Sequence, residues 1–402
     1  MTTSETPLTS VEICAGAGGQ AVGLHGAGFR HLALVEIDTH AATALRKNVN
    51  ERKGWEWERK NGDVLTLDVK SFSREKNLPK VKPRDLDLLA GGVPCPPFSL
   101  AGKQLGQYDE RDLFPEMLRL VKEFLPKAVM IENVRGLLQP AHKFADYRKE
   151  IESQLDDLGY TLRKWEIIEA ARLGVPQLRP RAILVAIHED YQHGEFVWPG
   201  ETERRKSVFD ALDDTMKRRY EAAKELYPEK ASRLDDAYVT WRKKARVGGV
   251  APTLVGGSKK HGGADLGPSR AKAAWKLLGV DGLGVANDEG KDIVVERDLL
   301  DSNGPKLTVE QAAIIQGFPD NWHFEGGKTA RYRQVGNAFP PPVAQAFGEE
   351  IRRMLLRARA AKAGSPNPPA TLTVSGDASS SSPDTSSPLR DPSSDLECAT
   401  VG

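Results

Sequence analysis

A cysteine between two prolines is the clearest sign of chemistry in the sequence. Residues 91–99 read GGVPCPPFS and follow the short apolar run 86–90, which we expect to form a buried strand. Pro94 and Pro96 remove backbone donors and restrict the residue before each of them, so Cys95 cannot lie inside a helix. The thiol is therefore predicted on a stiff loop at a strand end, where open α/β sheets bind ligands. A structural cysteine beside a turn is the alternative interpretation.

A glycine-rich turn between a strand and a helix is the second chemical signal. The strand candidate Val11–Cys14 is followed by Ala15-Gly16-Ala17-Gly18-Gly19 and then by the helical segment 20–27. Glycines let a ligand approach the backbone, and the helix N-terminus offers unpaired N–H groups. The next strand candidate ends at Glu36, 20 residues after Gly16, as expected for a carboxylate that binds ribose hydroxyls. A plain strand–helix–strand unit would give the same pattern.

Four further polar residues lie at the ends of predicted strands. Asp63 is predicted at a strand end and could accept a hydrogen bond from a base amine, although an Asp after Gly is more often a turn residue. The strand 127–131 leads into Glu132, and a carboxylate there is costly unless it has a partner or a function. Arg179 and Arg181 are two residues apart, so both would point to one face of an extended strand. Paired arginines suit carbonyl, carboxylate or phosphate recognition; solvated arginines on an edge strand are the alternative.

The composition is that of an ordinary soluble protein. The 402 residues carry a net charge of +1 with 39% hydrophobic and 28% charged residues, enough for one large and one smaller domain. Three cysteines fit a reducing cytosol, and no apolar run is long enough for a membrane span. We therefore expect a cytoplasmic protein. Any nucleic-acid signal must come from local basic clusters, because the net charge is close to zero.

Alternating strands and helices from residue 11 to residue 187 predict an α/β fold with a doubly wound sheet. The alternation stops near residue 190, and residues 190–305 show little periodicity. Basic groups recur there; each cluster could be only a solvated face. Trp241 and Trp275 lie among them and are interpreted as core of a small domain. The glycine-flanked Lys259-Lys260-His261 could approach a phosphate backbone or a base edge.

Regular structure returns at Leu307 in the sequence pattern. Thr308 and Gln311 form a predicted capping box for a helix that Gly317 ends. A last helix is predicted to run to about residue 360. The tail that follows is rich in Ser, Pro, Asp and Thr and has no aromatic residue, so it is expected to be disordered.

These motifs, in this order, resemble those of the cytosine-C5 DNA methyltransferases of bacterial restriction–modification systems. The resemblance covers nearly all of residues 8–360 and departs from the family at two positions. Cys14 stands where the family usually has a phenylalanine against the adenine, and Pro96 stands where glutamine is common. The matching motifs are Ala15-Gly16-Ala17-Gly18-Gly19, Glu36, Gly62-Asp63-Val64, Pro94-Cys95 with Phe98-Ser99, Glu132-Asn133-Val134, Gln177-x-Arg179-x-Arg181, Leu307-Thr308 to Gln316-Gly317-Phe318-Pro319-Asp320, and Gln334-Val335-Gly336-Asn337.

The resemblance implies a two-domain methyltransferase. Residues 8–190 and 329–360 would form the doubly wound catalytic domain, and residues 191–328 a smaller, irregular target-recognition domain. Residues 1–7 and 361–402 would be disordered. The implied reaction moves a methyl group from S-adenosylmethionine to C5 of a cytosine flipped out of duplex DNA, while the Cys95 thiolate is bonded to C6.

The resemblance also implies roles for individual residues. Glu132 would protonate N3 of the base, and Arg179 and Arg181 would anchor the base carbonyl and the active-site loop. The implied cofactor contacts are Cys14, Ala15, Gly16, Gly18, Gly19, Glu36, Ile37, Asp63, Val64, Pro94, Asn337 and Ala338. The implied DNA contacts are Ser99, Gln104, Lys259, Lys260, His261 and Gln334. The segment 191–305 would read the target sequence, no residue is assigned to a metal, and a monomer paired with a restriction endonuclease of the same site is expected.

Three other functions fit part of the sequence. An oxidoreductase with a nicotinamide cofactor would use the same glycine turn and Glu36, but it would leave Cys95 and Glu132 unexplained. A non-catalytic DNA-binding module would explain the basic clusters without needing Cys95. A tRNA cytosine methyltransferase on the same scaffold is the nearest alternative, and the long segment 191–305 favours DNA.

Overall fold

A computed structural model of the chain describes residues 6–93, 112–202, 204–256, 264–287 and 293–364. Contacts divide the chain into one compact unit, Met1–Pro366, and a second unit, Asn367–Gly402. All the described residues belong to the first unit. The division of residues 8–360 into two domains stays a prediction.

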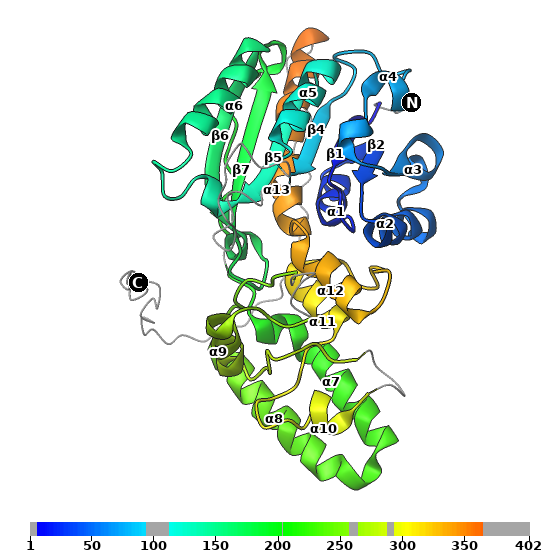
Figure 1. Cartoon of the computed structure of the whole chain (residues 1–402), viewed down its shortest axis with the longest axis vertical. Helices are drawn as coiled ribbons and strands as arrows, with labels where there is room; N and C mark the ends of the chain where they lie inside the picture. The colour runs from blue at the N-terminus through cyan, green and yellow to red at the C-terminus, as the bar shows by residue number, and fades with distance from the viewer. Residues whose placement is uncertain (1–5, 94–111, 203, 257–263, 288–292, 365–402) are drawn as a thin grey trace. The chain divides into compact units, whose positions relative to one another are not determined.

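A seven-stranded sheet organises the first unit (Figure 1). The strand order is β3-β2-β1-β4-β5-β7-β6, and β7 alone runs opposite to the other strands. This confirms the predicted doubly wound α/β sheet. The chain winds outward from β1 in both directions, and ligands bind at such a switch point, beyond the carboxyl ends of the strands. The strands are β1 (Leu8–Ile13), β2 (Phe29–Glu36), β3 (Asp63–Thr66), β4 (Leu88–Gly92), β5 (Ala128–Val134), β6 (Tyr160–Glu169) and β7 (Pro180–His188).

The register of the strands places the predicted site residues on one edge of the sheet. Ile13 at the end of β1 pairs with Val35 of β2 on one side and with Gly91 of β4 on the other. Gly92 pairs with Glu132 of β5. The glycine-rich turn, the start of the Cys95 loop and Glu132 therefore follow adjacent strands at the same edge.

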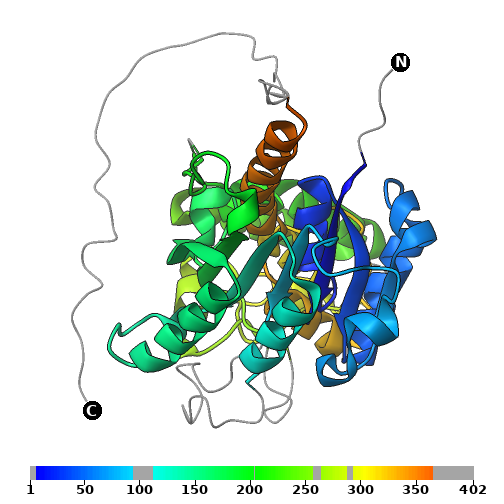
Figure 2. The same ribbon diagram turned by 90° about the horizontal axis from the view of Figure 1, so that it is seen from above.

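Helices cover both faces of the sheet (Figure 2). On one face α5 and α6 bury an apolar stripe, including Met117, Val121 and Ile151. On the other face α1 and α13 pack together against the sheet. The helices along this part of the chain are α1 (Gly19–Gly26), α2 (Thr39–Glu51), α3 (Glu56–Asn61), α4 (Arg74–Asn77), α5 (Phe114–Phe124) and α6 (Ala145–Asp157).

The last described helix, α13 (Pro341–Lys362), returns the chain to the sheet beside α1. A Cβ atom on Gly23 of α1 would lie 2.4 Å from the Pro341 carbonyl oxygen, so the glycine permits the close approach of the two helices. The ammonium of Lys362 lies 4.0 Å from the ring centroid of Tyr191. The predicted tail boundary at residue 361 is therefore too early, because the packed helix includes Lys362.

Residues 190–305 are more helical than the sequence pattern indicates. Helices α7 (Val208–Leu226), α8 (Ala231–Gly248), α9 (Ser269–Leu277) and α10 (Val295–Asp298) occupy this region, and α7 and α8 pack along each other. The expectation of little regular structure is wrong because the buried face of α7 includes Thr215 and Arg219, which break its apolar period. Trp241 and Trp275 are buried, which confirms their interpretation as core.

Two helices connect this region to α13. The capping box at Thr308 and Gln311 is present at the start of α11 (Val309–Gln316), and Gly317 ends that helix in the left-handed conformation, as predicted. Helix α12 (Lys328–Asn337) was not expected from the sequence. Its buried residues include the polar Gln334, so its sequence lacks the apolar stripe that would have predicted a helix.

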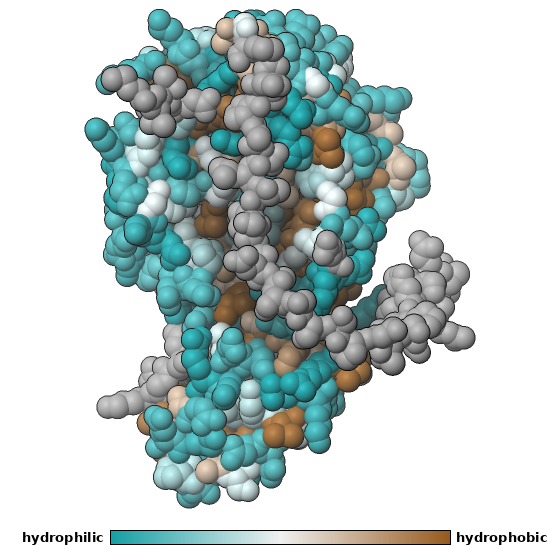
Figure 3. Space-filling view, turned by 180° about the vertical axis from the view of Figure 1, so that it is seen from behind, coloured by the Kyte–Doolittle hydropathy of each residue, from teal (hydrophilic) through white to brown (hydrophobic). Residues whose placement is uncertain are grey.

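Hydrophilic side chains predominate on the face of the molecule that Figure 3 shows, and hydrophobic residues appear there in small patches. In the described parts of the chain, no helix has the length and apolar character needed to cross a membrane.

Candidate active site

The glycine-rich turn is held to the end of β2 by hydrogen bonds. The Gly16 N–H donates to Glu36 Oε2 over 2.7 Å, and the Asp38 N–H donates to Glu36 Oε1 over 2.7 Å. Burial raises the pKa of Glu36, and these two N–H groups oppose that rise. Gly16 has φ +56°, and a Cβ atom there would meet nothing within 4 Å. The turn is therefore fixed on its inner side and open on its outer side, as a cofactor cradle requires.

The same turn packs against the junction of α12 and α13. A Cβ atom on Gly19 would lie 2.3 Å from the Phe339 carbonyl oxygen and 3.0 Å from Cβ of Ala338. Gly18 has φ +95°, and its Cβ would lie 2.6 Å from Leu45. The structure thus brings Gly16, Gly18, Gly19 and Ala338 together, although more than 300 residues separate the two segments.

Two side chains flank this turn at the sheet edge. Cys14 is half-buried at φ +55°, and burial, followed by the charges of Glu36 and Glu12, raises the pKa of its thiol. A neutral thiol is a poor nucleophile, so Cys14 does not suit covalent chemistry. Ile37 directly follows Glu36 and is 64% exposed, which offers an apolar surface beside the carboxylate.

The structure corrects the placement of Asp63. This residue begins β3 and pairs with Ala33, three residues before Glu36, so it lies roughly 10 Å from the edge that carries the turn. It is exposed, and Val64 after it is buried in the core. The expected strand end is wrong because the strand starts, and does not stop, at Asp63. The carboxylate that follows β3 is Asp68, whose charge adds to the rise in the Cys14 pKa.

Glu132 and Arg181 form an ion pair at the end of β5. Arg181 Nε lies 2.7 Å from Glu132 Oε1, and both side chains are largely buried. Burial lowers the pKa of Arg181, and the charge of Glu132 opposes that change. A Cβ atom on Gly92 would lie 3.3 Å from Glu132 Oε2, and Asn133 Nδ2 donates to the Val93 carbonyl over 3.2 Å. Glu132 therefore stands next to the strand that leads into the Cys95 loop.

Arg179 binds different partners from Arg181. It precedes β7, is fully buried, and donates to three backbone carbonyls: Leu254 from Nη1 over 2.7 Å, and Gly336 and Ala338 from Nη2 over 2.9 Å each. Burial and the charge of Arg181 lower the pKa of Arg179. The two arginines thus have different partners, main-chain carbonyls for Arg179 and Glu132 for Arg181, and their joint role at the base stays a prediction.

Two buried glutamines, which were not assigned a role from the sequence, complete this network. Gln177 donates to the Ile315 carbonyl over 3.1 Å and to Gln316 Oε1 over 2.6 Å, and it accepts from the Leu254 N–H over 3.0 Å. Gln316 in turn donates to the Ala338 carbonyl. An uncharged side chain near an arginine pair carries little signal in a sequence, and only its burial identifies these two.

Other expected residues lie outside the described ranges or are engaged elsewhere. Gln334 is described: its amide group donates to the Glu325 carbonyl over 2.7 Å and to the Ala330 carbonyl over 3.2 Å. Asn337 is exposed at the end of α12, and the Ala15 N–H donates to the Val35 carbonyl over 3.0 Å. The residues outside the described ranges are Pro94, Cys95, Ser99, Gln104, Lys259, Lys260 and His261.

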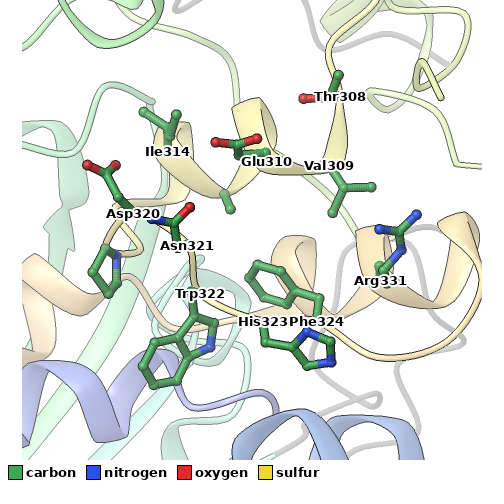
Figure 4. Close-up of a pocket in the computed structure, with 12 residues that line it drawn as sticks. Thr308, Val309, Glu310, Ile314, Asp320, Asn321, Trp322, His323, Phe324 and Arg331 are labelled. Atoms are coloured by element: carbon green, nitrogen blue, oxygen red, sulfur yellow. The ribbon is translucent and has the colours of Figure 1, made fainter. Parts of the chain in front are cut away.

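A cavity of about 410 Å³ opens between α11 and the loop that precedes α12 (Figure 4). Trp322, His323 and Phe324 form one wall. Trp322 donates from Nε1 to the Ala17 carbonyl over 2.8 Å, so its ring stands beside the glycine-rich turn. None of the residues predicted to hold the cofactor lines this cavity, and we assign no ligand to it.

A family model of C-5 cytosine-specific DNA methylases matches residues 8–353. This chain belongs to that family. As a C-5 cytosine-specific DNA methylase it is an enzyme, which excludes the nicotinamide-dependent oxidoreductase and the non-catalytic DNA-binding module.

Named relatives support the assignment to the C-5 cytosine-specific DNA methylases. The chain is 48% identical to the type II methyltransferase M.NaeI of Lentzea aerocolonigenes, over 87% of this chain and 75% of the relative. It is 45% identical to the type II methyltransferase M.NgoMIV of Neisseria gonorrhoeae, over 87% of this chain and 98% of the relative. The fold is similar to that of the Entamoeba histolytica methyltransferase EhMeth, with a TM-score of 0.55 at 15% identity over 86% of this chain and 98% of that one.

Proposed function

We propose that this methylase works through a covalent bond between Cys95 and C6 of the target cytosine. The observation that supports it best is the Glu132–Arg181 ion pair beside Gly92, three residues before Cys95. C5 of cytosine is a weak nucleophile. Thiolate addition at C6 moves an electron pair toward N3 and makes C5 enamine-like, so that C5 can take up a methyl group. Loss of the C5 proton to a base and elimination of the thiolate then restore the ring.

In this mechanism Glu132, at the end of β5, contacts N3 of the base. Charge develops at N3 during the addition, and a carboxyl group there can hydrogen-bond or donate the proton that neutralises it. Arg181 holds Glu132 through Nε and donates from Nη1 to the Pro180 carbonyl over 2.8 Å, so Nη2 is the group we assign to the O2 carbonyl of the base. The pair thus acts as one unit that orients the flipped cytosine above Cys95.

The cofactor that fits the sheet edge at β1 and β2 is S-adenosylmethionine, which supplies the methyl group. Its ribose would meet Glu36, its adenine the exposed Ile37, and its charged end the open glycine-rich turn at Gly16. Asn337 and Ala338 would close the site from the α12–α13 junction. We replace the expected contact at Asp63 with Asp68, because Asp68 follows β3 on the edge that carries Cys14.

The substrate we propose is a specific sequence in duplex DNA. The relatives M.NaeI and M.NgoMIV are named type II methyltransferases, which suggests that this enzyme modifies the site of a companion restriction endonuclease. The region of α7 to α10 is the long segment that no catalytic motif occupies, and it is the candidate reader of that sequence. The cytosine must leave the helix, because C6 is out of reach within a base-pair stack.

A methyl-transfer assay followed by sequencing tests this proposal. Purified enzyme and S-adenosylmethionine are incubated with genomic DNA and, in parallel, with tRNA, and cytosine methylation is mapped at single-base resolution. We expect 5-methylcytosine at one short DNA sequence and none in tRNA. Methylation of tRNA alone, or of DNA cytosines without regard to sequence, would overturn the proposed substrate.

A further inference from the structure

Two histidines and a glutamate from three different elements meet beside the first residues of β2. His25 lies in the last turn of α1, His31 is the third residue of β2, and Glu58 lies in α3. One ligand atom from each of the three lies within 4.8 Å of the other two. In the part of the chain that the structure describes, no other three His, Cys, Asp or Glu side chains meet in this way. The proposed reaction uses none of these residues, so their convergence needs its own explanation.

The Glu58 carboxylate is buried with one of its two oxygens unused. The side chain is 2% exposed, and Oε1 lies 3.1 Å from His25 Nδ1. Oε2 is buried and has no hydrogen-bond partner among the described residues. A buried carboxylate oxygen without a partner is costly, because it has left water and gained no bond in exchange. A cation beside Oε2 would remove that cost.

Aromatic and polar neighbours hold the two imidazole rings in place. The His25 ring stacks on the buried Trp55, with ring centroids 4.2 Å apart and planes inclined by 6°. His31 Nδ1 lies 2.9 Å from Ser10 Oγ, and Nε2 lies 3.0 Å from the Ala21 carbonyl oxygen. Either oxygen can accept the proton of one ring nitrogen and leave the other nitrogen as a ligand, which is the usual support of a metal-bound histidine.

Two imidazoles and a carboxylate form a set of donors that suits zinc. Ligands of a tetrahedral zinc ion lie about 3.3 Å apart, because each is about 2.0–2.1 Å from the metal. The 3.1 Å between His25 Nδ1 and Glu58 Oε1 is already close to that value. Rotations of these two side chains would close the wider gap to His31, and the 17% exposure of His25 gives the ion a path from solvent.

We propose that His25, His31 and Glu58 bind one Zn²⁺ ion, with water as the fourth ligand, and that this ion ties α3 to α1 and β2. Its role is structural, because His31 lies five residues before Glu36, or roughly 16 Å along β2 from the edge where the reaction is proposed. Zinc takes the place of the proton that His25 and Glu58 share, and that proton goes to solvent. The inference does not depend on the proposed reaction.

Zinc binding to metal-free protein tests the site directly. Wild type, His25→Gln and Glu58→Gln are dialysed against a chelator and then titrated with Zn²⁺ in a calorimeter. We expect wild type to bind one zinc ion and each variant to bind it at least about 100-fold more weakly, since loss of even an outer-shell partner typically costs 10–100-fold. Zinc affinity equal to wild type in either variant would place the ion elsewhere, for example on a cysteine, and would overturn the site.

The matched control is His323→Gln. His323 Nε2 lies 2.8 Å from Glu325 Oε2, so this histidine also contacts a carboxylate, but among the described residues no third ligand joins the two. We expect His323→Gln to bind zinc as wild type does. A loss of affinity in this variant comparable to that in His25→Gln would show that the calorimeter reports histidines in general, and it would count against the three-residue site.

Further measurements on wild type hold even if Glu58→Gln folds poorly. Cobalt(II) in place of zinc should give the visible absorption of a tetrahedral site without the charge-transfer band that a thiolate ligand adds. Hydrogen exchange of residues 56–61 should slow when zinc is added, whereas residues 114–124 should not change, and the methyl-transfer rate should be the same with and without zinc. A thiolate band, unaltered exchange in 56–61, or a wild type that binds no zinc would overturn the proposal, and a reaction that requires zinc would contradict the structural role.

Discussion

At the scale of single residues, the candidate site consists of polar side chains near the ends of neighbouring strands. Glu36 is the last residue of β2, Glu132 lies near the end of β5, and Arg181 is the second residue of the neighbouring antiparallel strand β7. Glu132 and Arg181 are mutually satisfied, which explains how a carboxylate can stay at a largely buried position. In the proposed function this pair orients the base.

Replacement of Glu132 by Gln tests the proposed catalytic role of this carboxyl group. The amide keeps the shape of the side chain and an oxygen for Arg181 Nε, but it cannot donate or accept the proton at N3. We expect the single-turnover rate of methyl transfer to fall by a factor on the order of 10² or more. The matched control is Glu166→Gln, which changes an exposed glutamate on β6 that pairs with Lys164. Equal rates for wild type and Glu132→Gln would refute the catalytic role.

At the scale of elements, a buried histidine ties β2 to its neighbours. His31 Nδ1 lies 2.9 Å from Ser10 Oγ on β1, and Nε2 lies 3.0 Å from the Ala21 carbonyl of α1. Burial lowers the pKa of His31 from 6.5 to about 4, and the charge of Glu58 opposes that change only in part. The folded protein therefore keeps this ring neutral at pH values where the unfolded chain protonates it.

The sign of the resulting pH dependence follows directly. Above pH 6.5 the ring is neutral in both states; as the pH falls toward 4, only the unfolded state gains the proton, so stability is lost. The loss from this group should reach about 2 kcal/mol at pH 5. Urea unfolding of wild type and His31→Gln at pH 7.5 and pH 5 measures it, and the variant should show the smaller difference between the two pH values. Identical differences would contradict the assignment.

The sequence predicted those elements that carry a local signal, such as a purely apolar buried face or a capping box. The stripe of α5 and the capping box of α11 were predictable because each is a local signal. The α7–α8 pair was missed because Arg219 and Thr215 lie on the buried face of α7, where their partners come from distant segments. Asp63 was misplaced because a residue type within a motif does not reveal whether it begins or ends a strand.

At the scale of the whole molecule, the compact unit ends shortly after α13. Arg359 donates to the Thr6 carbonyl over 2.9 Å and pairs with Asp87 over 3.1 Å, so the last helix is bonded to the residues that lead into β1 and β4. The tail beyond this helix lacks the apolar residues that a core needs. The two parts should therefore contribute very differently to stability.

Two truncations separate these contributions. A protein that ends at Pro366 should keep the melting temperature and the methyl-transfer rate of the full chain. A protein that ends at Leu355 loses the contacts of Arg359 and Lys362 and should melt at a lower temperature. A marked loss of stability or activity in the longer truncation would show that residues 367–402 dock onto the enzyme.

The central claim is that Cys95 bonds to the target cytosine, and covalent trapping tests it most directly. Duplex DNA with 5-fluorocytosine at the methylated position cannot lose a proton from C5, so the enzyme should remain attached after methyl transfer. We expect wild type to form a complex that survives denaturing electrophoresis and Cys95→Ser to form none. Cys14→Ser should form the complex as wild type does, because burial raises the pKa of the Cys14 thiol and makes it a poor nucleophile. A Cys95→Ser protein that forms the adduct as well as wild type would contradict the account.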